Sequence, residues 1–96
     1  MVKYYEGENL KELKGLWLVD FYADWCGPCK MMSPVLEQLE GIDVLKINVD
    51  EHGDLASEYK VMSIPNMKIL KDGEVVTELV GFHTKDDIDI IVNELK

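Results

Sequence analysis

Cys26 and Cys29 are the only cysteines of this 96-residue sequence, and two residues separate them. Pro28, which lies between them, suits the first turn of a helix, so we expect a helix to begin at the cysteines. The unpaired N–H groups and the positive dipole end of that helix would favour the thiolate of Cys26, which is the nucleophilic form. Because Cys29 lies one turn farther along, its sulfur would reach a mixed disulfide formed at Cys26. The spacing therefore predicts thiol–disulfide exchange, with Gly27 and Pro28 shaping the turn.

Asp20 lies in the middle of a nearly apolar run from Leu16 to Tyr22, which is typical of a central strand. An aspartate is depleted in strands and costly to bury, so its presence there indicates a role. The strand ends just before the cysteine helix, and this order favours a place for Asp20 beneath the cysteines. We interpret Asp20 as the proton acceptor for Cys29, and Lys46 on the neighbouring strand as the counter-charge of Asp20.

Two other interpretations of the cysteine pair are less favoured. As a structural staple, a disulfide that closes a loop of four residues would contribute only ~2 kcal/mol on the loop-entropy estimate. A zinc or iron–sulfur site needs about four ligands, but the sequence has no second cysteine pair. Neither histidine, His52 nor His83, lies at a ligand spacing. We therefore expect no metal and no cofactor.

The elements that must position this pair alternate between strands and helices along the chain. Strands are expected at residues 2–5, 16–22, 42–49, 66–70 and 74–80, and helices at residues 8–14, from the cysteines to Gly41, at 53–59 and from Thr84 onward. Pro34 should bend the helix that starts at the cysteines. A helix connects the strands at 16–22 and 42–49, so these strands should be parallel, whereas the last two strands should form an antiparallel hairpin. At this length we expect one domain over residues 1–96.

The composition excludes several classes of function. Ten lysines, no arginine and 19 acidic residues give a formal net charge of −9, which disfavours nucleic acid as a partner. No apolar window approaches the roughly 18 residues of a membrane span, and the first residues contain no apolar signal-peptide core. We therefore expect a cytoplasmic protein that binds neither nucleic acid nor membranes. We also expect a monomer, although the composition does not determine the oligomeric state.

The hexapeptide from Trp25 to Lys30 resembles the active site of the thioredoxin family. The resemblance spans nearly the whole chain. The matching features are the strand aspartate Asp20, the proline Pro34 inside the cysteine helix, the Lys-x-Asn-x-Asp pattern from Lys46 to Asp50, the pair Ile64-Pro65, the hairpin glycine Gly73 and the pair Val80-Gly81. It implies an α/β thioredoxin fold, with a central mixed five-stranded sheet in the order 1-3-2-4-5 flanked by four helices. It also implies a cis peptide bond before Pro65.

The resemblance implies a function as well, that of a protein disulfide reductase or dithiol electron carrier. Cys26 would attack the disulfide of a protein substrate, Cys29 would resolve the mixed disulfide, and a separate electron donor of the thioredoxin-reductase type would recharge the pair. An extended substrate segment would pair with the backbone of Ile64 beside Pro65, which is a form of β-strand addition. The substrate-binding residues implied in this way are Trp25, Gly27, Pro28, Ile64, Pro65 and Gly81.

Two other functions remain open from the residues alone. The chain would be an interaction module if a fixed partner docked on the same platform and redox chemistry were incidental. It would be a disulfide oxidase or isomerase if the chemistry ran in the opposite direction. The Gly-Pro dipeptide favours reduction, and the presence of both cysteines and Asp20 favours chemistry over simple docking. Tyr22, Asn66 and Phe82 depart from the family pattern and mark positions that would affect partner choice.

Overall fold

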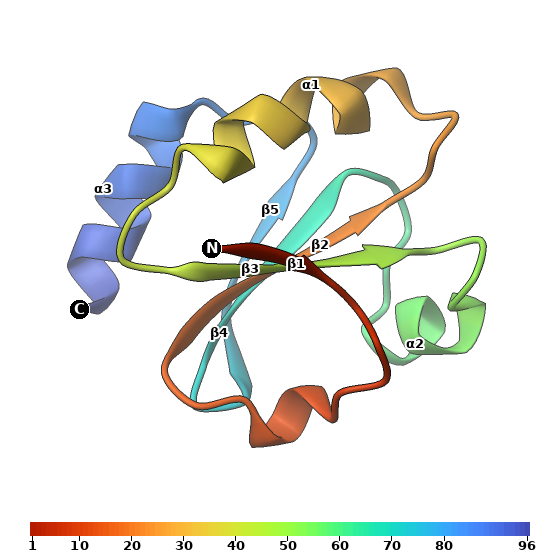
Figure 1. Ribbon diagram of the computed structural model, residues 1–96, viewed down its shortest axis with the longest axis horizontal. Helices are drawn as coiled ribbons and strands as arrows, with labels where there is room; N and C mark the ends of the chain where they lie inside the picture. Colours follow the sequence, from red (N-terminus) through yellow and green to blue (C-terminus); the bar gives the residue numbers. More distant parts are fainter.

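The computed structural model describes residues 1–96, and a five-stranded sheet runs through its centre (Figure 1). The elements in chain order are β1 (Val2–Tyr4), β2 (Leu16–Tyr22), α1 (Gly27–Glu37), β3 (Asp43–Asn48), α2 (Gly53–Glu58), β4 (Asn66–Lys71), β5 (Glu74–Val80) and α3 (Lys85–Leu95). A single turn of 3₁₀-helix, Leu10–Glu12, lies between β1 and β2. None of the helices has the length and apolar character that a membrane crossing requires.

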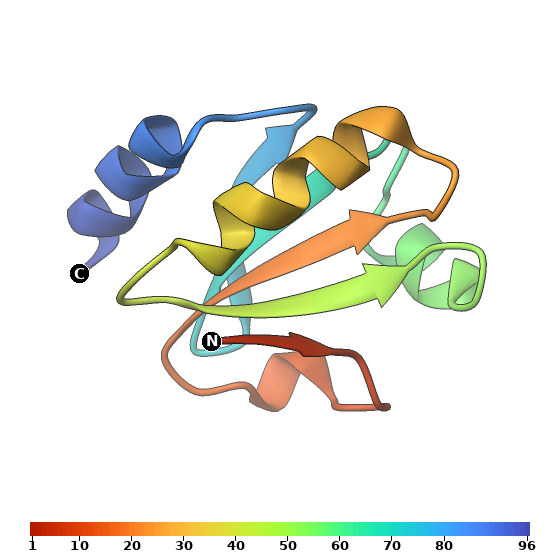
Figure 2. The same cartoon turned by 45° about the horizontal axis from the view of Figure 1, so that its top comes forward.

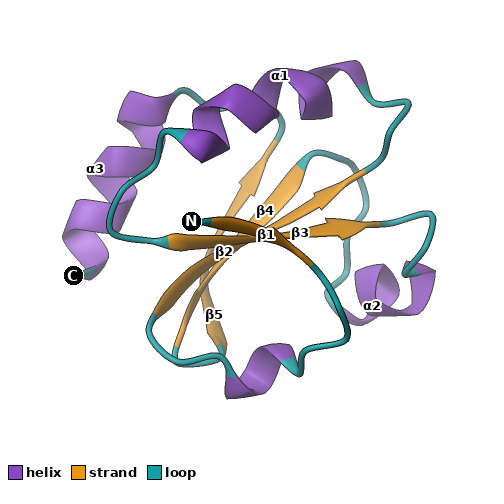
Figure 3. Ribbon diagram, viewed as in Figure 1, coloured by secondary structure: helices purple, strands orange, loops and turns teal.

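The strands lie in the order β1-β3-β2-β4-β5, which confirms the order expected from the resemblance (Figure 2). Figure 3 shows the strands at the centre of the molecule with the helices around them. β1, β3 and β2 are parallel, β4 runs antiparallel to β2, and β5 runs antiparallel to β4. β2 pairs with a strand on each side, and every residue from Leu18 to Phe21 is buried. This central position is the one that the nearly continuous apolar run predicts.

α1 and α3 cover one face of the sheet, and α2 and the 3₁₀ turn cover the other (Figures 1 and 2). Because successive side chains of a strand point to opposite faces, the core is divided in two. On the first face Met32 of α1 and Ile88 of α3 pack in one cluster with Leu18 of β2. On the second face Ala56 of α2 packs in another cluster with Phe21. Both faces of the central strands are therefore shielded from water.

The first predicted helix is wrong in type and extent. Residues 8–14 contain only one 3₁₀ turn, so three α-helices rather than four flank the sheet. The Asn9 side chain accepts a hydrogen bond from the Lys11 N–H, and Leu13 already has an extended conformation. Residues i and i+3 lie on the same side of a 3₁₀ turn. Leu10 and Leu13 therefore both reach the core around β2 and β3 without a longer helix.

α1 begins at the cysteines as predicted, but it ends at Glu37 rather than at Gly41. The sequence pattern predicts a longer helix because Leu39 continues the helical spacing of apolar residues. In the structure Leu39 and Ile42 lie beyond the helix and are still buried in the core beneath it. The apolar spacing past Glu37 thus reflects a buried connection to β3.

Candidate active site

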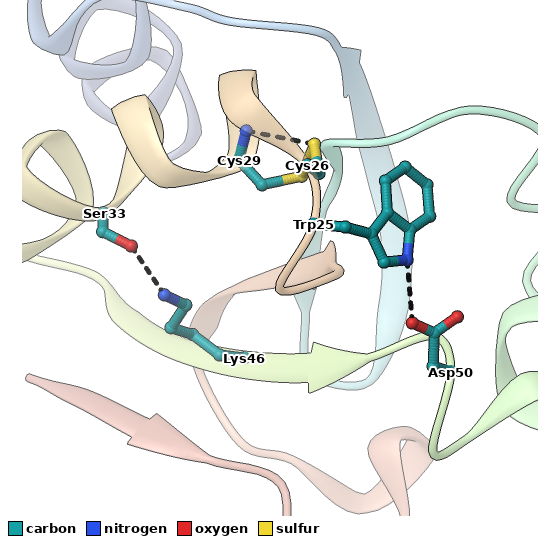
Figure 4. The surroundings of a disulfide bond; sticks show 6 residues. All are labelled: Trp25, Cys26, Cys29, Ser33, Lys46 and Asp50. Carbon is teal, nitrogen blue, oxygen red and sulfur yellow. Dashed lines mark hydrogen bonds between the residues drawn. A yellow bond between two sulfur atoms is a disulfide. The ribbon is translucent and has the colours of Figure 1, made fainter.

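Cys26 and Cys29 form a disulfide at the N-terminus of α1, with their Cα atoms 5.2 Å apart (Figure 4). Cys26 is the N-cap of the helix, and its Sγ accepts a hydrogen bond from the Cys29 N–H at 3.2 Å. Pro28 lies in the first turn, where its missing N–H sacrifices no helical hydrogen bond. The first turn contains no acidic residue, so the positive end of the helix dipole is available to a thiolate at Cys26.

The loop before β4 lies against the cysteine pair. Cys26 is 4% exposed and Cys29 is 3% exposed, and Ile64 packs against the small cluster that they form. The peptide bond between Ile64 and Pro65 is cis, as the resemblance implies. The Gly81 N–H donates a 2.8 Å hydrogen bond to the Pro65 carbonyl. The structure therefore places Ile64 against the cysteines and ties Pro65 to the end of β5.

Trp25 offers an exposed apolar surface next to the cysteines. Its side chain lies largely in solvent, and the residue is 70% exposed. The indole N–H donates a 2.9 Å hydrogen bond to Asp50 Oδ2, just beyond β3 (Figure 4). Trp25, Ile64 and Met62 line an open depression of about 400 Å³, and the position that a Cβ atom of Gly27 would occupy is open. The sequence reasoning did not predict Asp50 as a site residue, although the Lys-x-Asn-x-Asp pattern ends on it.

Asp20 is fully buried on the face of the sheet that α1 covers, which it shares with Leu18. It is the register partner of Lys46 on β3. Neither carboxylate oxygen has a hydrogen-bond partner, and Asp20 makes no ion pair with Lys46. Burial raises the pKa of Asp20 to about 6, and the charge of Lys46 partly offsets this effect. A raised pKa is the direction that the sequence predicts for Asp20 as a buried carboxyl group.

The Lys46 ammonium interacts with groups other than Asp20. Lys46 is buried, and its Nζ donates a 2.8 Å hydrogen bond to Ser33 Oγ on α1 (Figure 4). The centroids of the Tyr22 and Tyr4 rings lie 4.8 Å and 5.5 Å from Nζ, which is within the range of cation–π attraction. The two rings meet edge to face, with centroids 6.3 Å apart.

A cavity of about 220 Å³ beneath α1 connects these groups to the second cysteine. Cys29, Ser33 and Lys46 line it, and so do both tyrosines. The sequence reasoning missed Ser33 and Tyr4. A signal for Ser33 was present, because residues four apart on a helix lie on one face and Ser33 follows Cys29 at that spacing. The structure shows no group of three or more His, Cys, Asp or Glu side chains that could hold a metal ion.

Asn66 and Phe82 are the other two positions that depart from the family pattern. Asn66 is buried, and its Nδ2 donates to Glu78 Oε2 at 3.4 Å. Glu78 also pairs with Lys68. Phe82, which follows Gly81, is 43% exposed. Asn66 would thus influence binding from within the sheet, whereas Phe82 is accessible to a partner; their effect on partner choice stays a prediction.

In comparison with known proteins, this chain matches members of one family. The Thioredoxin family model matches residues 3–94. A thioredoxin of Bacillus subtilis (strain 168) is 49% identical over 86 residues, which cover 84% of this chain and 83% of that protein. A thioredoxin of Chlamydia caviae is 43% identical over an alignment of 100 positions, which covers 98% of this chain and 98% of that protein. Among solved structures, a mutant thioredoxin from Halobacterium salinarum NRC-1 has a TM-score of 0.89 and 37% identity, and the match covers 97% of this chain and 88% of that chain.

These matches extend over nearly the whole chain, and the fold and the cysteine pair agree with them. The structure has the expected sheet order, the helix capped by Cys26 and the disulfide between Cys26 and Cys29. The chain belongs to the thioredoxin family and is a thiol–disulfide oxidoreductase that acts as a dithiol disulfide reductase.

Proposed function

We propose that Cys26 is the nucleophile of this reductase and that Cys29 is the resolving thiol. The observation that carries the assignment is the position of Cys26 as the N-cap of α1, where its Sγ accepts the Cys29 N–H. In the reduced protein the same N–H and the helix dipole would stabilise a thiolate at Cys26. Cys29 lies inside the first turn and lines the cavity beneath the helix, which suits a thiol that acts second.

The reaction proceeds in two displacements. The Cys26 thiolate attacks one sulfur of a substrate disulfide; a bond forms between the two sulfurs, and the other substrate sulfur leaves with the electron pair. Cys29 then gives up its proton and attacks Cys26 Sγ, which forms the Cys26–Cys29 disulfide and releases the remaining substrate sulfur as a thiolate. The substrate gains two electrons and the protein loses two. A separate reductase of the thioredoxin-reductase type supplies two electrons to restore the dithiol.

Asp20 is the proposed acceptor of the Cys29 proton, and Lys46 is the charged neighbour of Asp20. A carboxyl group with a pKa of about 6 suits a base that works near neutral pH. Burial supports the assignment, because a fully buried carboxylate without hydrogen-bond partners lowers the stability of the fold rather than adding to it.

The proposed substrates are disulfide-containing proteins that bind in an extended conformation. The exposed Trp25 ring, Ile64 and the loop at Pro65 form the platform, and backbone pairing beside Ile64 supplies affinity with few side-chain requirements. Gly27, Pro28 and Gly81 complete the proposed binding surface. We propose that the protein acts in a reducing compartment, the cytoplasm, because its only two cysteines form the exchange pair. We also propose that it acts as a monomer.

The test is to change each cysteine separately and to offer each variant a model protein disulfide, with dithiothreitol present to follow reduction and without it to trap adducts, because dithiothreitol would cleave a mixed disulfide. Cys26→Ser should abolish reduction without forming a covalent adduct. Cys29→Ser should accumulate a mixed disulfide through Cys26, which mass spectrometry of the peptides would locate. A stable adduct through Cys29 in the Cys26→Ser variant would reverse the assignment. Reduction by neither variant nor wild type, with retained binding to a partner, would indicate the interaction module instead.

A further inference from the structure

Lys46 lies at the centre of a row of side chains beneath α1. Its register partner on β1 is Tyr4, and its register partner on β2 is Asp20. Paired residues of neighbouring strands project from the same face of a sheet, so the Lys46 side chain has a tyrosine on one side and a carboxyl group on the other. Lys46 is 7% exposed. A buried ammonium in this position requires polar partners. Two sets of partners lie beside Lys46: one is Ser33 with the two tyrosine rings, and the other is the Asp20 carboxylate.

The ammonium interacts with the set that does not contain Asp20. Nζ donates to Ser33 Oγ at 2.8 Å, and the Tyr22 and Tyr4 rings lie 4.8 Å and 5.5 Å away. Both carboxylate oxygens of Asp20 remain without a partner although they are the acceptors on the neighbouring strand. Ser33 and both tyrosines line the cavity that Cys29 also lines, and Asp20 does not. The Lys46 side chain therefore lies in the cavity that Cys29 lines, and its ammonium donates to Ser33 rather than to Asp20.

We propose that Ser33, Tyr4 and Tyr22 are positioning residues of the exchange reaction, which hold the Lys46 ammonium toward the Cys29 cavity and keep it from pairing with Asp20. The proposal rests on the proposed role of Asp20 as the proton acceptor. An ammonium in direct contact with a carboxylate stabilises the charged form and makes the carboxylate a weaker base. Holding the ammonium on Ser33 and the rings leaves Asp20 able to take the proton of Cys29 near neutral pH.

Few other charged or titratable groups face the row. α1 contributes Cys29 and Lys30 to the cavity, and the chain after β2 contributes Asp24. Glu51 lies near enough to act on the Tyr22 hydroxyl. From β4 the register partner of Asp20 is Met67, which does not titrate. Lys46 is the cation that acts on the Asp20 carboxyl group and lowers its pKa. Burial has the opposite and larger effect, so the pKa of Asp20 is raised.

The experiment measures the titration of Asp20 directly in the oxidised protein, by NMR of the side-chain carboxyl carbon, with Asp20→Asn to assign the signal. Ser33→Ala removes the hydroxyl but keeps a good helix former. Asp20, the register partner of Lys46, then offers the ammonium two unpartnered carboxylate oxygens, so the titration midpoint should fall by about 1 pH unit or more. Ser33→Thr, which keeps a hydroxyl, should restore a midpoint close to that of wild type.

The rings are tested in the same way, with a matched control for each. Tyr4→Leu and Tyr22→Leu remove the aromatic face and should also lower the midpoint. Tyr4→Phe and Tyr22→Phe keep the face without the hydroxyl and should leave the midpoint close to wild type, because cation–π attraction depends on the ring. A midpoint that is unchanged or higher in both Ser33→Ala and the leucine variants would overturn the proposal.

A rate measurement separates this proposal from the proposed role of Asp20. The reduced protein is mixed with a small symmetrical aromatic disulfide, so that Cys26 takes up one aromatic thiol as a mixed disulfide and the other leaves as a thiolate. The release of the bound aromatic thiol by Cys29 is then followed at pH 7. Ser33→Ala should slow this release by roughly threefold for a change of one pH unit in the midpoint, at a Brønsted slope of about 0.5, and Ser33→Thr should recover the rate. The NMR midpoint decides whether these residues position Lys46. The rate of Asp20→Asn decides separately whether Asp20 is the proton acceptor.

Discussion

Asp20 and Lys46 are register partners on β2 and β3, yet the Lys46 ammonium donates its hydrogen bond to Ser33 Oγ at 2.8 Å and both Asp20 oxygens lack a partner. Two opposite charges thus lie side by side in a buried region without forming an ion pair. The carboxyl group is affected mainly by burial, which raises its pKa to about 6. This relationship links the stability of the protein to the chemistry at Cys29, and it gives the first two predictions.

Asp20→Asn should stabilise the oxidised protein at pH 8. The folded state binds the Asp20 proton more tightly than the unfolded chain does, so the wild-type free energy of unfolding falls as pH rises from the ordinary pKa of 3.8 to about 6. The distance between these pKa values corresponds to roughly 3 kcal/mol, an upper value for the gain at pH 8. Near pH 4 the two proteins should be about equally stable. Urea melts at both pH values measure the difference.

Glu37→Gln is the control for that experiment. Glu37 is exposed at the end of α1, so its substitution should change the stability at pH 8 and at pH 4 by similar small amounts. An Asp20→Asn protein that is less stable than wild type at pH 8 would mean that Asp20 is an ordinary core residue whose interactions support the fold.

Asp20→Asn should also slow the second displacement. Without a base beneath α1, Cys29 would lose its proton to water, and general-base catalysis is worth about 100-fold or more. The release of a thiol from a mixed disulfide at Cys26, followed between pH 4.5 and pH 8, should be slower above pH 6, should approach the wild-type rate near pH 4.5, where Asp20 is protonated, and should lose the rise centred near the pKa of Asp20. Equal rates and equal pH profiles in the two proteins would exclude Asp20 from the reaction.

Asp50→Ala should weaken substrate binding through Trp25. The indole N–H donates to Asp50 Oδ2 at 2.9 Å, and losing an exposed hydrogen bond of about 1 kcal/mol would let the ring reorient. We expect KM for a model protein disulfide to rise by roughly two- to tenfold, while kcat and the stability change little. Asp54→Ala, an exposed aspartate in α2, is the control. An unchanged KM would mean that the orientation of the ring does not matter for binding.

Thr84→Ala should lower the stability without affecting the exchange reaction. Thr84 is the N-cap of α3, and its Oγ1 accepts a hydrogen bond from the Asp87 N–H at 3.2 Å. Loss of such a cap lowers the free energy of unfolding by about 1 kcal/mol. Thr84→Ser keeps the hydroxyl and should therefore keep most of the wild-type stability. Urea melts and the rate of disulfide reduction test both parts. A slower reduction rate in the alanine variant would show that α3 contributes to the active site.

Much of the candidate site is readable from the sequence because its signals are local. The helix start at the cysteines follows from Pro28 and the spacing of the pair, and Asp20 stands out because it interrupts an apolar strand. The order of the strands came from the family resemblance, and the structure agrees. The helix expected at residues 8–14 failed because two leucines three apart suit a 3₁₀ turn as well as an α-helix.

The partner of Lys46 was decided only by the tertiary structure. The sequence determined by itself that a lysine lies on a buried strand, that a serine follows Cys29 by four residues, and that tyrosines stand near the ends of two strands. It does not contain the register that places Tyr4 and Asp20 on either side of Lys46, or the packing that brings Ser33 within 2.8 Å of its Nζ. Helix starts and strand burial depend on residues within a turn or two of each other, whereas contacts across strands and layers depend on the closing of the whole sheet beneath α1.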